Sequence, residues 1–331
     1  MSTSESWFYL EDDLTRVGSV RRAATAMADA LGLSATQVAD LAIIATELAT
    51  NLVKHAREGM MHVRPVRDAD EAGVQLVSID SGPGMADVAR SQVDGESTAG
   101  TLGIGLGAVA RLADRCEIYS KPGRGTIVVA ELWHRKPPGG HLRADGIARP
   151  LTGETVSGDT FARRVSDDRY QVMVCDGLGH GPMAAAASQA AFGAFHEAPQ
   201  GPPADVVRYL NAALTHTRGA ALAVAEIDTE TAAVRLCGLG NIASSVVAGR
   251  QRHGMISMPG IAGHHRSGVK EFGYPFPVGA VLVMHSDGVS SRWELDGYQG
   301  MESPLVIAAT VLRDAGIRRD DACVLVAKGL P

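Results

Sequence analysis

The stretch Tyr170–Ala185, YQVMVCDGLGHGPMAA, contains the change of local structure that decides the fold. An apolar, β-favouring run leads to Asp176, and a glycine-rich loop then leads into an alanine-rich helix. Such loops often bind phosphate, but the carboxylate of Asp176 would repel one. The stretch predicts a strand, a loop and a helix, and it leaves three interpretations of Asp176 open: no functional role, an Asp-Gly turn, or a ligand of a cation.

Length and composition indicate a globular protein with two domains. The 331 residues are enough for two separate cores, and 45% hydrophobic with 21% charged residues is ordinary for folded chains. A net charge of -6 without blocks of like charge disfavours nucleic acid and membrane surfaces as partners. We expect no signal peptide and no membrane span. The four cysteines form no C-x-x-C pair, so we expect reduced thiols in a cytoplasmic protein.

A proline- and glycine-rich segment, HRKPPGGHLRADG, separates two differently patterned halves. We therefore predict domains at residues 1–135 and 145–331, joined by a linker at 136–144. The first half alternates helical and strand-like periodicity, which predicts an α/β sandwich. The second half has many short strands interrupted by three helical stretches, so the whole chain is expected to be of the mixed α/β (α+β) class.

In the first domain, Glu47, Asn51 and His55 lie one turn apart on one face of a predicted helix. Taken alone, these three residues are better explained as a solvated polar face. Three further motifs follow in order: D-x-G-x-G from Asp80, G-x-G-x-G before a helix, and G-x-G-T near the last strand of this domain. Their defining residues are Asp80, Gly82, Gly84, Gly103, Gly105, Gly107 and Thr126.

Together these motifs resemble the GHKL ATPases, and most closely the small serine kinases and anti-sigma factors of bacterial partner switching. The resemblance implies a Bergerat-type α/β sandwich that binds ATP with Mg²⁺. It implies that Asn51 coordinates the Mg²⁺, that Asp80 contacts the adenine amino group with Thr126 nearby, and that the loop 100–107 covers the phosphates. Glu47 is then the candidate general base for phosphoryl transfer.

In the second domain, acidic residues stand beside apolar β segments at four places: Asp159, Asp176, Asp287 and the pair Asp320–Asp321. If the ends of these strands converge, the carboxylates repel one another and raise one another's pKa unless cations are present. An oxygen-only ligand set favours Mg²⁺ or Mn²⁺ over zinc. We expect Gly177, which has no side chain, to turn its carbonyl toward such a metal.

The ordered motifs G-D, D-G-x-G-H-G, G-N, S-D-G and D-D resemble the type 2C metal-dependent protein phosphatases, particularly the branch with the stage II sporulation (SpoIIE) phosphatase. The resemblance implies an α-β-β-α sandwich with two Mn²⁺ or Mg²⁺ ions. Asp176 would bridge the metals and act with Asp159 in catalysis. The remaining implied ligands are the Gly177 carbonyl, Asp287 and Asp320, the last preferred over Asp321 because of its place in the motif.

The histidine of the same loop, His180, is displaced from its position in the broader class. We leave open whether it acts as a general acid or makes a structural or metal-water contact.

The expected function is hydrolysis of phosphoserine or phosphothreonine on a partner protein. The resemblance implies a phosphorylated STAS-domain antagonist as substrate, and a sigma-factor regulator as a further partner. The ATP-binding domain would oppose or gate the phosphatase. Two alternatives stay open: a non-catalytic anti-sigma or scaffold module, and a serine kinase in which the phosphatase is a minor reset activity.

Overall fold

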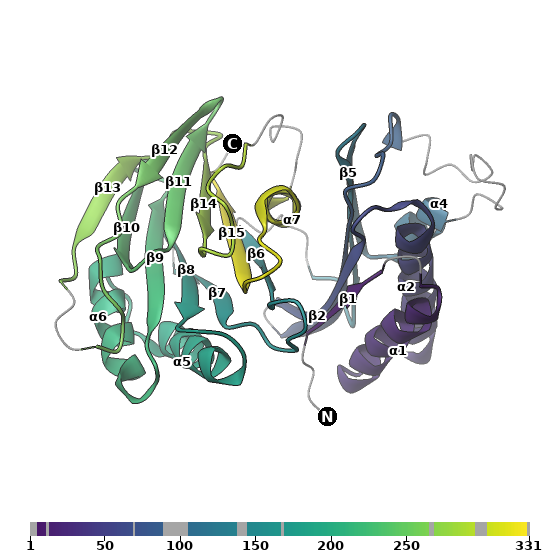
Figure 1. Ribbon diagram of the computed structural model, residues 1–331, viewed down its shortest axis with the longest axis horizontal. Coiled ribbons are helices and arrows are strands. Elements are labelled where there is room, and N and C mark those ends of the chain that lie inside the picture. The colour runs from purple at the N-terminus through teal and green to yellow at the C-terminus, as the bar shows by residue number, and fades with distance from the viewer. Residues whose placement is uncertain are drawn as a thin grey trace. The chain divides into compact units, whose positions relative to one another are not determined.

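The computed structural model describes residues 5–10, 13–68, 70–88, 105–137, 144–166, 169–264, 268–294 and 303–329. The chain forms two compact units, Met1–Gly140 and His141–Pro331, so the division falls inside the segment 136–144. Both units combine helices with sheets, which confirms the predicted mixed α/β class (Figure 1). In the described ranges no helix is both long enough and apolar enough to cross a membrane.

The first unit is a two-layer sandwich whose helices pack on one face of an antiparallel sheet (Figure 1). The sheet order is β1-β2-β3-β5-β4. The strands are β1 (Ser6–Tyr9), β2 (Met60–Asp68), β3 (Glu71–Ile79), β4 (Arg115–Lys121) and β5 (Gly125–Trp133). The helices are α1 (Thr15–Ala30), α2 (Ala35–His55) and α4 (Gly105–Leu112).

Helix α2, which carries Glu47 and Asn51, has its start fixed by local sequence. Ser34 and Gln37 form a capping box, in which each side chain bonds to the backbone N–H of the other residue. Apolar residues of α2 then pack on the sheet, with Ile44 and Leu48 fully buried beside Leu76 of β3. The polar face of α2 is thereby turned away from this core.

The second unit has two five-stranded antiparallel sheets with the orders β13-β10-β9-β8-β7 and β12-β11-β14-β15-β6. The first contains β7 (Asp159–Ser166), β8 (Arg169–Gly177), β9 (Ala220–Asp228), β10 (Ala233–Leu239) and β13 (Glu271–Pro275). The second contains β6 (Ala144–Arg149), β11 (Ala243–Ala248), β12 (Gln251–Met255), β14 (Val281–His285) and β15 (Ala322–Lys328).

Helices cover the outer faces of both sheets in this unit. Helices α5 (Pro182–Glu197) and α6 (Pro203–Ala213), with a short 3₁₀ turn at Leu214–His216, pack on the first sheet, and α7 (Pro304–Ala315) packs on the second. A separate apolar core lies between the sheets and includes Val174, Leu236, Leu282 and Leu325. The predicted α-β-β-α sandwich is therefore confirmed.

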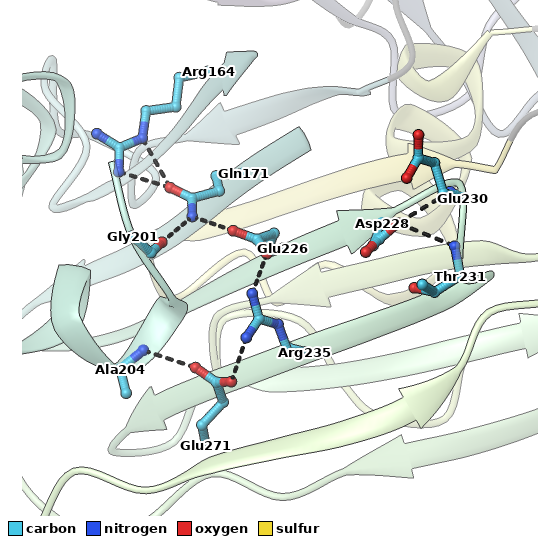
Figure 2. A network of polar contacts seen from close by, with 10 residues as sticks. All are labelled: Arg164, Gln171, Gly201, Ala204, Glu226, Asp228, Glu230, Thr231, Arg235 and Glu271. Carbon is cyan, nitrogen blue, oxygen red and sulfur yellow. Dashed lines mark hydrogen bonds and ion pairs between the residues drawn. The ribbon is translucent and has the colours of Figure 1, made fainter. Parts of the chain in front are cut away.

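A polar network anchors the α5–α6 connection to the first sheet. One side chain from each of its five strands joins a continuous series of hydrogen bonds and ion pairs (Figure 2): Arg164, Gln171, Glu226, Arg235 and Glu271. At one end, Arg164 Nη1 donates to the carbonyl of Phe195, near the end of α5, over 2.9 Å. At the other, Glu271 accepts from the backbone N–H of Ala204 at the start of α6 over 3.1 Å. Because its charges are paired, the network fixes where both helices lie on the sheet.

Candidate functional site

The strand register places the first two predicted acids directly opposite each other. Asp159 at the start of β7 pairs with Asp176 near the end of β8. Burial, followed by the negative charge of Asp176, raises the pKa of Asp159 well above its usual range. Burial, followed by the charges of Asp287 and Asp320, raises the pKa of Asp176 to about 7. These mutual effects show that the structure brings the four predicted carboxylates into one cluster.

Asp159 is held by a residue that the sequence did not identify. The Ser286 hydroxyl donates to Asp159 Oδ2 over 2.6 Å and accepts from the backbone N–H of Cys323 over 2.9 Å. Ser286 and Asp159 are both buried, so the hydroxyl fixes the carboxylate where water does not compete. The one sequence signal for this role is the position of Ser286 immediately before Asp287 in the S-D-G motif.

Asp287, which follows β14, accepts a hydrogen bond from the segment that leads into β11, the neighbouring strand of the second sheet. Asn241 lies just before β11 and its Nδ2 donates to Asp287 Oδ2 over 2.7 Å. The sequence placed Asn241 in the G-N motif without giving it a role. The structure indicates that it orients this carboxylate toward the cluster.

The neighbouring acids Asp320 and Asp321 have different environments. Asp321 is buried, and its two oxygens accept from the backbone N–H groups of Leu151 over 2.7 Å and Gly158 over 3.0 Å. Its carboxylate therefore holds the backbone at Leu151 and at Gly158 in place. Asp320 is only partly buried, and burial together with the charge of Asp287 raises its pKa. This difference favours Asp320 as the residue available to a metal.

Gly177 has a structural reason to be glycine besides the predicted one. A Cβ at this position would lie 2.2 Å from the carbonyl oxygen of Ala184, in the first turns of α5. Only glycine lets the helix approach the end of β8 so closely. That its carbonyl turns toward a metal stays a prediction.

The acid cluster fits the chemistry of hard divalent cations. In three of its carboxylates, Asp159, Asp176 and Asp320, the raised pKa values report negative charge without sufficient compensation. Among the described residues, no three His, Cys, Asp or Glu side chains already enclose a metal position. Bound Mg²⁺ or Mn²⁺ would remove the mutual repulsion and let the carboxylates approach one another.

His180 lies at the edge of this cluster. Its Nδ1 is 3.4 Å from Glu154 Oε1, and its side chain is 63% exposed. Burial and the charge of Asp287 raise the pKa of Asp320, and the charge of His180 lowers it by a smaller amount. Both interpretations of His180 remain consistent with this position.

In the first unit, the start of α4 lies against the polar face of α2. A Cβ on Gly105 would be 3.2 Å from Glu47 Oε2 and 3.8 Å from Asn51 Nδ2. The glycine motif and the acidic-plus-Asn helix are therefore adjacent, as the sequence predicted. Gly107 is buried in α4, whereas Gly103 and the other loop residues up to position 104 lie outside the described residues.

The second part of this candidate nucleotide site lies where β3 ends and β5 begins. Asp80 Oδ1 accepts from the N–H of Gly82 over 2.7 Å, and Asp80 donates its own N–H to the carbonyl of Thr126 over 2.9 Å. Gly84 has φ +66°, a conformation that favours glycine. The Thr126 hydroxyl lies 2.9 Å from that of Ser120, a residue the sequence did not indicate. Asp80 and Thr126 are thus brought together as predicted.

Comparisons with known proteins agree with both geometries. Residues 10–131 match the histidine kinase-like ATPase domain, and residues 166–329 match stage II sporulation protein E (SpoIIE). The serine/threonine-protein kinase RsbT of Bacillus subtilis (strain 168) is 35% identical over 109 residues, which is 33% of this chain and 82% of the relative.

Two solved structures are similar to part of this chain, and the first of them shows the likeness of the fold. One, from a description of the bacterial stressosome, has a TM-score of 0.51 and 23% identity, over 56% of this chain and 98% of its own. A second, RsbX in complex with magnesium, has a TM-score of 0.49 and 17% identity, over 64% of this chain and 98% of its own.

The fold and the two sites define a fusion of a kinase-like ATPase domain with a type 2C serine phosphatase domain, as in partner-switching regulators. The chain belongs to the histidine kinase-like ATPase family through residues 10–131 and to the SpoIIE phosphatase family through residues 166–329. Both halves of the predicted resemblance are confirmed.

Proposed function

We propose that the second unit hydrolyses phosphoserine or phosphothreonine on a partner protein, using two Mn²⁺ or Mg²⁺ ions. The observation that supports this most directly is the pairing of Asp159 with Asp176, whose pKa burial and neighbouring acids raise to about 7. Asp176 would bridge the ions. The other ligands would be Asp159, Asp287, Asp320 and the Gly177 carbonyl.

Three of the proposed ligands are held by different parts of the fold. Ser286 orients Asp159, and Asn241 orients Asp287. Asp320 follows a loop that Arg149 fixes by donating from Nη2 to the carbonyl of Ile317 over 2.6 Å. When bound, the two cations would activate water for attack and neutralise charge on the phosphoryl group. The role of the chain is to keep the ligands in place before substrate arrives.

The proposed substrate is a phosphorylated STAS-domain antagonist in a cytoplasmic partner-switching pathway, with a sigma-factor regulator as a further partner. The family of the first unit and its RsbT-like sequence support this class of partner. In the first unit, we propose that Asn51, Asp80, Thr126 and the glycines bind Mg-ATP.

A serine kinase activity is a second candidate function. It is favoured by Glu47, which lies beside Asn51 and next to the start of α4, because nucleotide binding alone does not require a general base. This domain would then oppose the phosphatase. If it only binds ATP, it would gate the phosphatase instead.

The test of the phosphatase is Asp176→Asn in the full chain. With phosphorylated STAS-domain proteins and Mn²⁺, mass spectrometry should show loss of phosphate with wild type and about 10²-fold or slower loss with the variant. Asp205→Asn is the matched control, because this exposed aspartate pairs with Arg208 on α6 and lies outside the cluster. Wild-type turnover by Asp176→Asn at saturating metal would show that the two-metal assignment is wrong.

A further inference from the structure

Arg218 lies across from the loop that follows the Asp176–Gly177 pair. Strands β8 and β9 are antiparallel, with Asp176 opposite Ala221 and Gly177 opposite Ala220. The pairing continues beyond the strands, because Leu178 donates its N–H to the carbonyl of Gly219 over 3.1 Å. The same register places Arg218 opposite Gly179. Accordingly, Arg218 Nη1 would be 3.5 Å from a Cβ built on Gly179.

The backbone around Arg218 is firmly held. The N–H of Gly219 donates to Thr217 Oγ1 over 3.0 Å, and the Arg218 carbonyl lies 3.3 Å from His264 Nε2. Gly219 has φ +84°, and a Cβ there would lie 2.6 Å from the carbonyl oxygen of Ala262, so other residues are excluded. The position from which the Arg218 side chain projects is therefore fixed.

The Arg218 side chain, by contrast, is exposed and has no polar partner among the described residues. Most ordered arginines in this unit are used internally: Arg149 and Arg164 donate to backbone carbonyls, and Arg235 pairs with Glu226. Arg218 thus offers five N–H donors in a planar fork beside Gly179, in the loop that follows Asp176 and Gly177.

The charge balance of the proposed reaction requires such a cation. Four ionised carboxylates are neutralised by two divalent ions, but a phosphomonoester adds about -1.5 to -2 charges at pH 7. An arginine fork binds phosphoryl oxygens through two parallel charge-assisted hydrogen bonds, which lysine cannot reproduce.

We propose that Arg218 binds the phosphoryl group of the phosphoserine or phosphothreonine substrate and so sets affinity for it. This inference rests on the proposed phosphatase function, because the acid cluster is taken as the place where the phosphoryl group binds. Arg218 would contribute to substrate binding, while the acidic residues would contribute the metal ligands.

The experiment compares Arg218→Gln with Arg218→Lys in the full chain, with p-nitrophenyl phosphate, a phosphoserine peptide and inorganic phosphate as probes. Arg218→Gln should raise KM for both substrates and the inhibition constant of phosphate by about 10- to 100-fold, with a much smaller change in kcat. Arg218→Lys should recover part of the loss. Thermal unfolding and Mn²⁺ affinity should stay at wild-type values, because the Arg218 side chain makes no polar contact in the described part of the fold.

Arg250→Gln is the matched control, since this exposed arginine lies in the turn between β11 and β12, at the opposite end of β11 from Asn241. An unchanged inhibition constant for phosphate in Arg218→Gln overturns the inference. So does a loss confined to the phosphopeptide, which would mean that Arg218 contacts the peptide.

³¹P NMR with Mg²⁺ measures phosphate binding independently of turnover. Arg218-dependent phosphate binding without monoester hydrolysis would support the inference and contradict the proposed function.

Discussion

Replacing Ser286 with alanine separates the positioning of Asp159 from its role as a ligand. The substitution removes the 2.6 Å hydrogen bond to Asp159 Oδ2 and leaves the N–H of Cys323 without its 2.9 Å acceptor. Among the interactions that act on the Asp159 carboxyl, the Ser286 hydroxyl lowers its pKa, whereas burial and the neighbouring acids raise it. Its loss therefore raises this pKa further and makes the carboxylate a poorer metal ligand.

Two magnitudes follow from these contacts. The two lost hydrogen bonds cost about 0.5–1.5 kcal/mol each, so the metal-free unit should lose about 1–3 kcal/mol of unfolding free energy. For a domain of this size the melting temperature would fall by about 2–10 °C. Loss of a contact that orients a ligand typically weakens metal binding by about 10- to 100-fold.

The assay is Mn²⁺ titration by calorimetry, with thermal unfolding of the metal-free chain measured in parallel. Thr310→Val is the matched control, because its buried hydroxyl donates to the carbonyl of Val306 within α7, which carries none of the four acids. It should change stability slightly and leave Mn²⁺ affinity unaltered. Wild-type Mn²⁺ affinity in folded Ser286→Ala would refute the positioning role, and with it the assignment of Asp159 as a ligand held in place by the fold.

Three further substitutions test the other assignments. Asn241→Ala frees Asp287 and should weaken Mn²⁺ binding about tenfold, and equal affinity by calorimetry contradicts this. Asp80→Ala should abolish Mg-ATP binding; competition by millimolar ATP at wild-type strength would show that Asp80 does not hold the adenine. Glu47→Ala should abolish labelled phosphate transfer from ATP to a STAS-domain partner while ATP binding and dephosphorylation persist. If no transfer occurs even when Asp176→Asn has silenced the phosphatase, the kinase proposal fails, and a dephosphorylation rate altered by Asp80→Ala favours gating.

The sequence was most informative where chemistry and chain position coincide. Acids at strand ends predicted the cluster because antiparallel strands of one sandwich bring their ends together, and Asp159 indeed pairs with Asp176. In the first unit, Asp80 and Thr126 follow the same logic, since both lie where β3 and β5 meet. Glycine spacing also located the start of α4, where Gly105 faces Glu47.

Other features depend on which residues of neighbouring strands pair, and this register could not be predicted from the sequence. Strand β1 has only four residues and is recognised through its pairing with β2, and β12 has mostly exposed residues without a strong apolar pattern. The network from Arg164 to Glu271 consists of four charged residues and Gln171, which would each be expected in solvent (Figure 2). They pair because neighbouring strands place them side by side on one face of the sheet.

The neighbours Asp320 and Asp321 show why residue type alone does not define a site. Both are acidic and both precede β15, so residue type treats them alike, and the sequence favoured Asp320 through its place in the D-D motif alone. In the fold, Asp321 accepts two backbone hydrogen bonds, and turning it toward a metal would leave the N–H groups of Leu151 and Gly158 without their acceptor. Asp320 also accepts a backbone hydrogen bond, from the N–H of Asp321 to Oδ1 over 3.0 Å, but this is a single bond from its own neighbour. Burial and the like charge of Asp287 raise the pKa of Asp320, and a cation would relieve that repulsion. The distinction therefore arises from the loops that pack around Asp321, which are distant from it in sequence.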